Sequence, residues 1–291
     1  MGESNLIKIV SETTEKLFKK LSGGKVKFRS KIIDNVMVFL GAAGGVGTTT
    51  IINNIAYTLT LKEISVLIID LDILRPAQHN FLKLQPALNK KDLVSFILGR
   101  STLGESIDTI DNISLLTAHN RSLIDLVNCD NELCAENFEE GMQRLRELYD
   151  VILIDCPYQL NHEIINHTLY KADSIFIVWD ENVTCINNIE RIKRDLKLTG
   201  IGAFNRLKVI MNKRTEIHYP ESIFEKLKIE LLTTLPYETA IIESGILGQI
   251  FCKDGASKSN TATLFVNKIE KLAEKILEIG GYRAEWTPKG S

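Results

Sequence analysis

Short apolar runs that alternate with amphipathic segments constrain the fold of this chain more than any other feature. Seven runs rich in β-branched residues predict strands at residues 36–40, 65–70, 112–116, 151–155, 174–178, 207–211 and 230–235. Apolar residues at helical spacing predict helices near residues 49–62, 91–99, 137–148, 162–170, 185–198, 221–228, 237–248 and 260–279. Because the strand runs are continuously apolar, each strand is expected to be buried on both faces. The sequence therefore predicts an α/β fold with a mostly parallel central sheet of about seven strands and helices on both faces.

The chain is expected to form one folded domain with short extensions at both ends. Residues 1–31 read as a basic amphipathic helix and linker, residues 32–281 as the domain, and residues 282–291 as a flexible tail. The leader holds eight lysines and arginines against three glutamates, whereas the whole chain has 35 basic and 37 acidic residues. Two interpretations of the leader stay open. It either packs as a solvated helix on its own domain or contacts an anionic membrane, DNA or an acidic protein.

Composition favours a protein that stays inside the cell. The five cysteines form no CxxC pair, which predicts reduced thiols, and no apolar run approaches the roughly 20 residues of a membrane span. We expect a cytoplasmic protein, with recruitment to the inner face of the membrane or to a cell pole as a further possibility through the basic leader.

A glycine-rich stretch, "GAAGGVGTTT" at residues 41–50, directly follows the first strand and opens a helix. At such a position small residues let backbone N–H groups approach phosphate oxygens, and the helix N-terminus adds a partial positive charge. The residues expected to surround a phosphate are Gly44, Gly45, Val46, Gly47, Thr48, Thr49 and Thr50. Thr49 is also expected to offer its hydroxyl to Mg²⁺.

Three aspartates follow other predicted strands at their carboxyl ends. Asp70 and Asp72 end "LIIDLD", and Asp155 ends "VILID". The carboxyl ends of parallel strands meet at one edge of a sheet, so these side chains are expected near the glycine loop. Carboxylates there suit a Mg²⁺ ion held mostly through its water ligands. Taken singly, each aspartate fits a helix cap or a turn better than a metal site. All three at strand ends downstream of a glycine loop favour the metal site instead.

Several stretches together resemble the MinD/ParA family of P-loop NTPases with a deviant Walker A motif. The resemblance runs from about Val36 to Glu278 and rests on "AGGVGTTT", "IIDLD", "DVILIDCP", "KADSIFIVWDENVTCINNIERI", "VIMNKR" and "LLTTLPYETAIIESGILGQIF". It implies a P-loop fold, ATP or ADP with Mg²⁺ as cofactor, and a homodimer. It also implies that Asp72 is a switch carboxylate near the attacking water. By the same resemblance, Asn212 with Lys213, and Pro236 with Tyr237, contact the nucleotide base.

Two departures separate this chain from the family pattern. The signature lysine of the deviant loop falls on Ala43, and the Walker lysine falls on Thr48. Among the subfamilies of this family, a small residue in place of the Walker lysine is most similar to the pattern of the CpaE/TadZ-like pilus assembly and localisation proteins. The resemblance then implies a dimeric positioning or scaffold factor in a pilus, secretion or similar machine, working with its protein components. Hydrolysis of ATP is expected to be weak or absent, because both cations aimed at the transferred phosphate are missing.

Two other readings use the same residues. An active ATPase for partition, conjugation or localisation would need a substitute cation, for which Arg75, Lys213 and Arg214 are of the right type. The stretch "DLDILRP" resembles the second phosphate motif of bacterial tyrosine autokinases, but only Tyr282 lies near the end of the chain.

Overall fold

The computed structural model describes residues 34–84, 91–119, 128, 131–157, 163–198, 206–216, 222–255 and 259–282 of the chain. The chain divides into two units, residues 1–31 and 32–291, and every described residue belongs to the second unit. The basic leader and all but the first residue of the predicted tail lie outside the described residues. The boundaries expected for leader, domain and tail therefore stay predictions.

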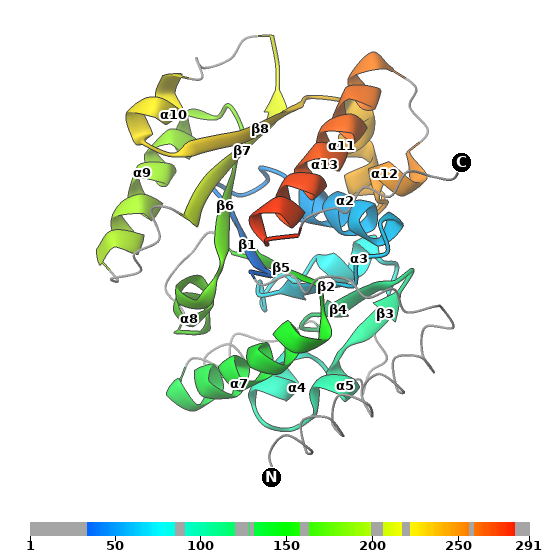
Figure 1. The fold of residues 1–291 in the computed structure, drawn as a ribbon, viewed down its shortest axis with the longest axis vertical. Helices are drawn as coiled ribbons and strands as arrows, with labels where there is room; N and C mark the ends of the chain where they lie inside the picture. The colour runs from blue at the N-terminus through cyan, green and yellow to red at the C-terminus, as the bar shows by residue number, and fades with distance from the viewer. Residues whose placement is uncertain are drawn as a thin grey trace. The chain divides into compact units, whose positions relative to one another are not determined.

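The centre of the described unit is an eight-stranded sheet (Figure 1). Its strands in chain order are β1 (Val36–Gly41), β2 (Val66–Asp70), β3 (Asp108–Ile110), β4 (Ile113–Leu116), β5 (Val151–Cys156), β6 (Ser174–Trp179), β7 (Leu207–Arg214) and β8 (Glu230–Pro236). Their order across the sheet is β3-β4-β2-β5-β1-β6-β7-β8, and only β3 runs antiparallel to its neighbour. The predicted α/β fold with a mostly parallel sheet is confirmed.

The helices cover both faces of this sheet. They are α2 (Thr48–Leu61), α3 (Gln78–Phe81), α4 (Leu93–Ile97), α5 (Leu103–Ser106), α7 (Glu132–Leu148), α8 (Glu163–Lys171), α9 (Val183–Leu198), α10 (Ser222–Leu227), α11 (Thr239–Ile246), α12 (Phe251–Asp254) and α13 (Asn260–Ile279). The crossover through α2 runs toward the β3 edge, whereas the crossover through α8 runs toward the β8 edge. Right-handed crossovers therefore place α2, with α12 and α13 packed on it, on the face opposite α7 and α8 (Figure 1).

The core explains why the strand runs are continuously apolar. Every residue of β1, β5 and β6 is buried, as expected for strands with helices on both sides. Phe39 of β1 stacks on Phe176 of β6, with ring centroids 4.9 Å apart. The C-terminal helix α13 buries Ile269, Leu272 and Ile276 against this unit and packs on α2 and β8.

This topology sets the position of a site. The chain leaves β1 toward one side of the sheet and leaves β5 toward the other, and the two strands are neighbours. Loops that diverge in this way leave a crevice outside the carboxyl ends of the two strands, which is where α/β sheets bind ligands. The glycine loop follows β1, and Asp155 lies on β5, both at that edge.

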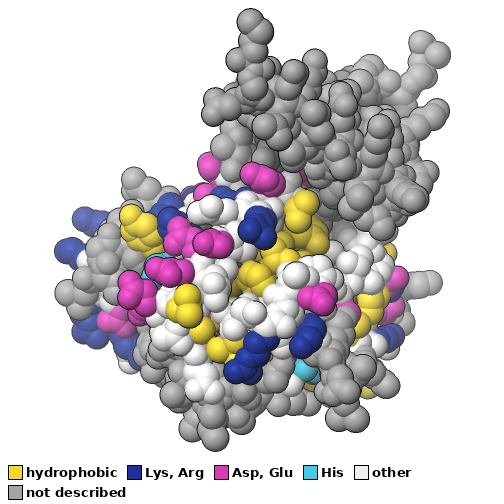
Figure 2. All heavy atoms as spheres, turned by 90° about the horizontal axis from the view of Figure 1, so that it is seen from below, with side chains coloured by type: hydrophobic (Ala, Val, Ile, Leu, Met, Phe, Trp, Pro, Cys, Tyr) yellow, Lys and Arg dark blue, Asp and Glu magenta, His cyan; other side chains and the backbone are white. Residues whose placement is uncertain are grey.

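The surface carries charges of both signs. On the face in Figure 2, basic side chains are interspersed with acidic ones among the described residues. None of the described helices has the length and apolar character needed to cross a membrane.

Candidate functional site

The glycine loop has the backbone geometry of an anion cradle. Gly45 and Gly47 have φ angles of 78° and 95°, in the left-handed region that favours glycine. Gly47 caps α2 without any side-chain hydrogen bond, so the first amides of that helix are left for an anion. A Cβ built on Gly44 or Gly45 would meet nothing within 4 Å. The loop therefore has open space at these two positions.

Side chains from two other elements hold this loop from behind. Asn188 of α9 donates a hydrogen bond of 2.7 Å to the carbonyl of Ala42. From the end of β7, Asn212 donates to the carbonyl of Val46 at 2.8 Å, and Lys213 Nζ donates to the carbonyl of Gly45. The carbonyls of Ala42, Gly45 and Val46 are thus occupied by these donors, so the polar groups that the loop can offer to an anion are its N–H groups after Ala42.

Gly47 is the tightest point of the cradle, and its replacement is expected to be costly. A Cβ there would lie 2.5 Å from Nδ2 of Asn212, and the residue has a positive φ. Gly47→Ala is expected to lower the free energy of unfolding by about 1–3 kcal/mol, measured by chemical denaturation. Gly44→Ala is the matched control, because that position is open, and it should change stability by less than about 1 kcal/mol. Equal losses in the two variants would contradict this geometry.

A threonine and an aspartate meet at the front of the loop. Thr49 Oγ1 donates to Asp155 Oδ2 at 2.8 Å, and Nε2 of Gln78 donates to the same oxygen at 2.7 Å. Among the described residues no group of three or more His, Cys, Asp or Glu side chains could hold a metal ion. Mg²⁺ commonly needs less than that, because it keeps several waters and takes one or two protein oxygens plus phosphate oxygens. Thr49 and Asp155 fit such a site.

Asp70 lies deeper and is used differently. Its oxygens accept backbone N–H groups from Asp72 at 3.1 Å, Ala77 at 2.9 Å and Gln78 at 3.1 Å. Burial, together with the charge of Asp155, raises the pKa of Asp70 to about 8, although the three backbone donors oppose this shift. Asp70 therefore shapes residues 72–78, and its expected role toward a metal stays a prediction.

Burial also raises the pKa of Asp155, from 3.8 to about 6, against the lowering effect of the Thr49 and Gln78 hydrogen bonds. Between about pH 4 and pH 6, Asp155 therefore stays protonated in the folded protein but is ionised in the unfolded chain. That contribution to stability is present at low pH and is lost as the pH rises from about 4 to about 6. Asp155→Asn lacks this titration. Relative to the wild type, it is expected to gain on the order of 1–3 kcal/mol of unfolding free energy over that interval. Denaturation in EDTA across this pH range measures it, and a pH-independent difference would contradict it.

The remaining predicted residues lie around this centre. Asp72 accepts the N–H of Arg75 at 3.1 Å and lies 3.7 Å from its guanidinium, whose side chain is 72% exposed. Pro236 pairs with Arg214 across β7 and β8, and the N–H of Tyr237 donates to the carbonyl of Arg214 at 2.8 Å. The structure thus brings Asn212, Lys213 and Asp155 to the loop. It places Pro236 and Tyr237 one strand further out.

Of the three cations considered as substitutes, Lys213 is the one that contacts the loop. It has a φ angle of 55°, and its ammonium lies 3.9 Å from Asp180 as well as against the carbonyl of Gly45. Arg75 pairs with Asp72, and Arg214 donates to the sulfur of Met211 at 3.3 Å.

Three residues of the site were not predicted: Gln78, Asn53 and Asn188. Only Asn53 had a signal in the sequence, since it is polar in an otherwise apolar stretch of α2. Gln78 and Asn188 come from distant segments, and nothing in their spacing indicates a contact with the loop.

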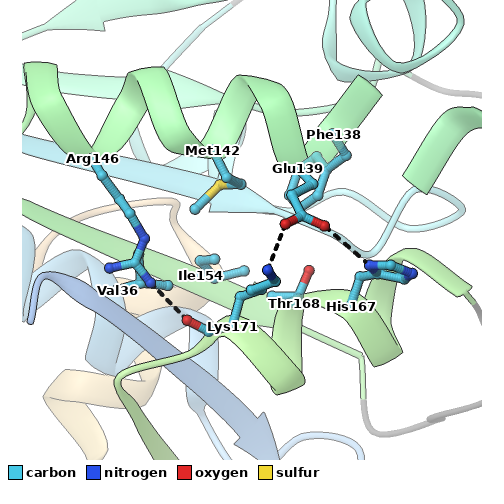
Figure 3. Close-up of a pocket in the computed structure, with 9 residues that line it drawn as sticks. All are labelled: Val36, Phe138, Glu139, Met142, Arg146, Ile154, His167, Thr168 and Lys171. Atoms are coloured by element: carbon cyan, nitrogen blue, oxygen red, sulfur yellow. Dashed lines mark hydrogen bonds and ion pairs between the residues drawn. The ribbon is translucent and has the colours of Figure 1, made fainter. Parts of the chain in front are cut away.

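A second hollow lies between α7, α8 and the sheet, away from the loop (Figure 3). Its walls include Phe138, Met142 and Ile154. Across its rim, Glu139 pairs with Lys171 at 2.6 Å and with His167 at 3.6 Å. These contacts, with Lys171 as the main cause, lower the pKa of Glu139. The polar groups of this hollow thus join two helices.

Comparisons with known proteins agree with the fold. A family model described as an AAA domain matches residues 34–206. A putative septum site-determining protein MinD from Chlorella vulgaris is 25% identical over 85% of this chain and 90% of its own length. MinD from Pyrococcus horikoshii, solved in complex with Mg-ADP, superimposes with a TM-score of 0.70 at 21% identity, over 87% of this chain and 99% of that one. A ParA family ATPase from Chlorobium tepidum gives a TM-score of 0.68 at 21% identity, over 82% and 98%.

Proposed function

Because the chain belongs to the family that this AAA domain defines, with MinD and ParA proteins among its relatives, we propose that it binds ATP or ADP with Mg²⁺ at the glycine loop. The observation that carries the proposal is the loop itself. It keeps its two left-handed glycines, its uncapped helix start and the open space at Gly44 and Gly45 although both lysines are absent. A related fold has been solved with Mg-ADP, which supports the same ligand class.

Separate groups of residues would bind the phosphates, the metal ion and the base. The amides of residues 44–50 surround the phosphates, and Lys213 supplies the nearby positive charge. Thr49 and Asp155 hold Mg²⁺, which when bound neutralises phosphate charge. The nucleotide base would contact Asn212, Pro236 and Tyr237. Asp72, held by Arg75, is the carboxylate available to a water molecule.

Hydrolysis in this site is expected to be slow. Cations aimed at the transferred phosphoryl group are worth about 10³- to 10⁵-fold in rate, and Ala43 and Thr48 supply none. We therefore propose a dimeric positioning or scaffold factor of the MinD/ParA type, in which bound nucleotide sets the conformation. A role in pilus or secretion assembly, as in CpaE/TadZ-like proteins, rests on the replaced Walker lysine. Residues 1–31 would contact either the cytoplasmic face of an anionic membrane or DNA.

A second candidate function is an active ATPase, and one observation favours it. Lys213 already touches the loop through the carbonyl of Gly45, and its ammonium sits on a flexible four-carbon stem that can reorient. In this case Lys213 would replace the missing Walker lysine both in binding the phosphates and in stabilising the transition state of hydrolysis.

Two measurements on the full chain separate these functions. Light scattering after size exclusion is expected to show a dimer that forms with Mg²⁺ and ATP, and phosphate release should stay near the background of a Thr48→Ala variant. A monomer at every nucleotide concentration would contradict the positioning factor. Turnover far above that background, lost in Arg75→Ala or Lys213→Ala, would favour the ATPase.

A further inference from the structure

A buried chain of amide side chains connects the site to the segment that carries Asp72. Gln78 and Asn53 are both fully buried. Asn53 Nδ2 donates to the Gln78 Oε1 at 2.6 Å and to the carbonyl of Thr49 at 2.8 Å, and Gln78 Nε2 donates to Asp155 Oδ2. Asn53 of α2 therefore holds the side-chain amide of Gln78, and Gln78 of α3 donates to the carboxylate of Asp155.

Gln78 also bridges the two acids of the site. Asp70 of β2 and Asp155 of β5 are direct neighbours in the sheet register. The backbone N–H of Gln78 donates to Asp70, and its side chain donates to Asp155. The residue is thus fixed at both ends, and any displacement of residues 72–78 would withdraw a donor from Asp155.

The fold alone does not account for this pair. Oδ1 of Asn53 is buried without a hydrogen-bond partner, which is unfavourable in a protein interior. Two apolar side chains of similar size at positions 53 and 78 would remove that unsatisfied oxygen, and such replacements are often neutral or stabilising. An apolar pair would lack the hydrogen-bond donor that Gln78 offers to Asp155.

We propose that Gln78 is a positioning residue that orients Asp155 for Mg²⁺ and couples the metal site to the segment carrying Asp72. Both donors use Oδ2 of Asp155, so Oδ1 is the oxygen left for a metal-bound water. When Mg-nucleotide binds, Gln78 keeps the carboxylate in place only while residues 72–78 hold their present conformation. The inference rests on the proposed nucleotide site and adds a link between its metal and its switch segment.

The test compares ADP affinity in Mg²⁺ and in EDTA, by calorimetry on the full chain. Gln78→Leu is expected to reduce the gain in affinity that Mg²⁺ gives by about 10-fold and to leave the affinity in EDTA unchanged. A fall in both affinities together would indicate general damage to the fold and overturn the inference, as would an unchanged gain from Mg²⁺.

The double variant Asn53→Val with Gln78→Leu guards against a variant that fails to fold. It removes both buried polar ends, so it is expected to unfold at a denaturant concentration at or above that of Gln78→Leu while showing the same loss of the Mg²⁺ gain. A double variant that recovers the full Mg²⁺ gain would refute a positioning role. A wild-type protein that binds no ADP in either condition would instead refute the proposed nucleotide site.

Discussion

Replacing Thr48 with lysine is expected to raise the affinity for ATP by about 10- to 100-fold. A charge-assisted hydrogen bond contributes about 1.5–3 kcal/mol, and residue 48 is the first residue of α2, directly after the left-handed Gly47. The residue is half-buried. Calorimetry with ATP and Mg²⁺ measures the gain.

Adding Ala43→Lys to Thr48→Lys is expected to restore turnover as well. The two cations together are expected to increase phosphate release by about 10³-fold or more over the wild type. Thr48→Met, which has similar length and no charge, is the matched control and should change neither affinity nor rate in this direction. If the two lysines leave both quantities unchanged, the loop does not hold a phosphate.

Removing the ammonium of Lys213 is expected to weaken ATP binding by about 10-fold or more. Lys213 is the cation that the structure places against the loop, and its side chain is 31% exposed, so solvent screens part of its charge. Lys213→Met keeps the length of the side chain. Arg75→Met is the control, because that guanidinium is 72% exposed and pairs with Asp72 rather than with the loop.

The two lysine experiments also test each other. If Lys213 replaces the Walker lysine electrostatically, Lys213→Met should cost much less affinity in the Thr48→Lys background than in the wild type. Additive effects would mean that residues 48 and 213 act on separate parts of the ligand. No effect of Lys213→Met in either background would leave the main-chain amides as the whole of the binding energy.

Much of this fold could be predicted because its strands are buried on both faces. All seven predicted strands are present, each with one end as predicted and the other shifted by one to three residues. The missed strand, Asp108–Ile110, has three residues, lies at the edge of the sheet and is not fully buried, so it lacks a long apolar run. The missed helices α3, α5 and α12 have four residues each, too few to show a helical period.

The site could be predicted only as far as strand ends reveal it. Asp155, Asn212 and the loop meet because their strands end at the same edge, which sequence order and strand pattern indicate. The aspartates look alike in the sequence, yet Asp70 is committed to backbone amides whereas Asp155 faces Thr49. That difference depends on how residues 72–78 turn back, and no periodicity encodes it. Gln78 escaped prediction for the same reason.

Nucleotide binding in this chain is expected to depend on main-chain amides and a helix start, with Lys213 beside them, and not on a lysine in the loop. Calorimetric titration of the purified full chain with ATP and Mg²⁺ tests it most directly. The predicted result is ATP binding with a dissociation constant between about 10 µM and 1 mM. This binding is expected to be lost in Gly47→Ala and kept in Gly44→Ala. The absence of any binding heat up to several millimolar ATP, with a folded wild-type protein, would contradict it.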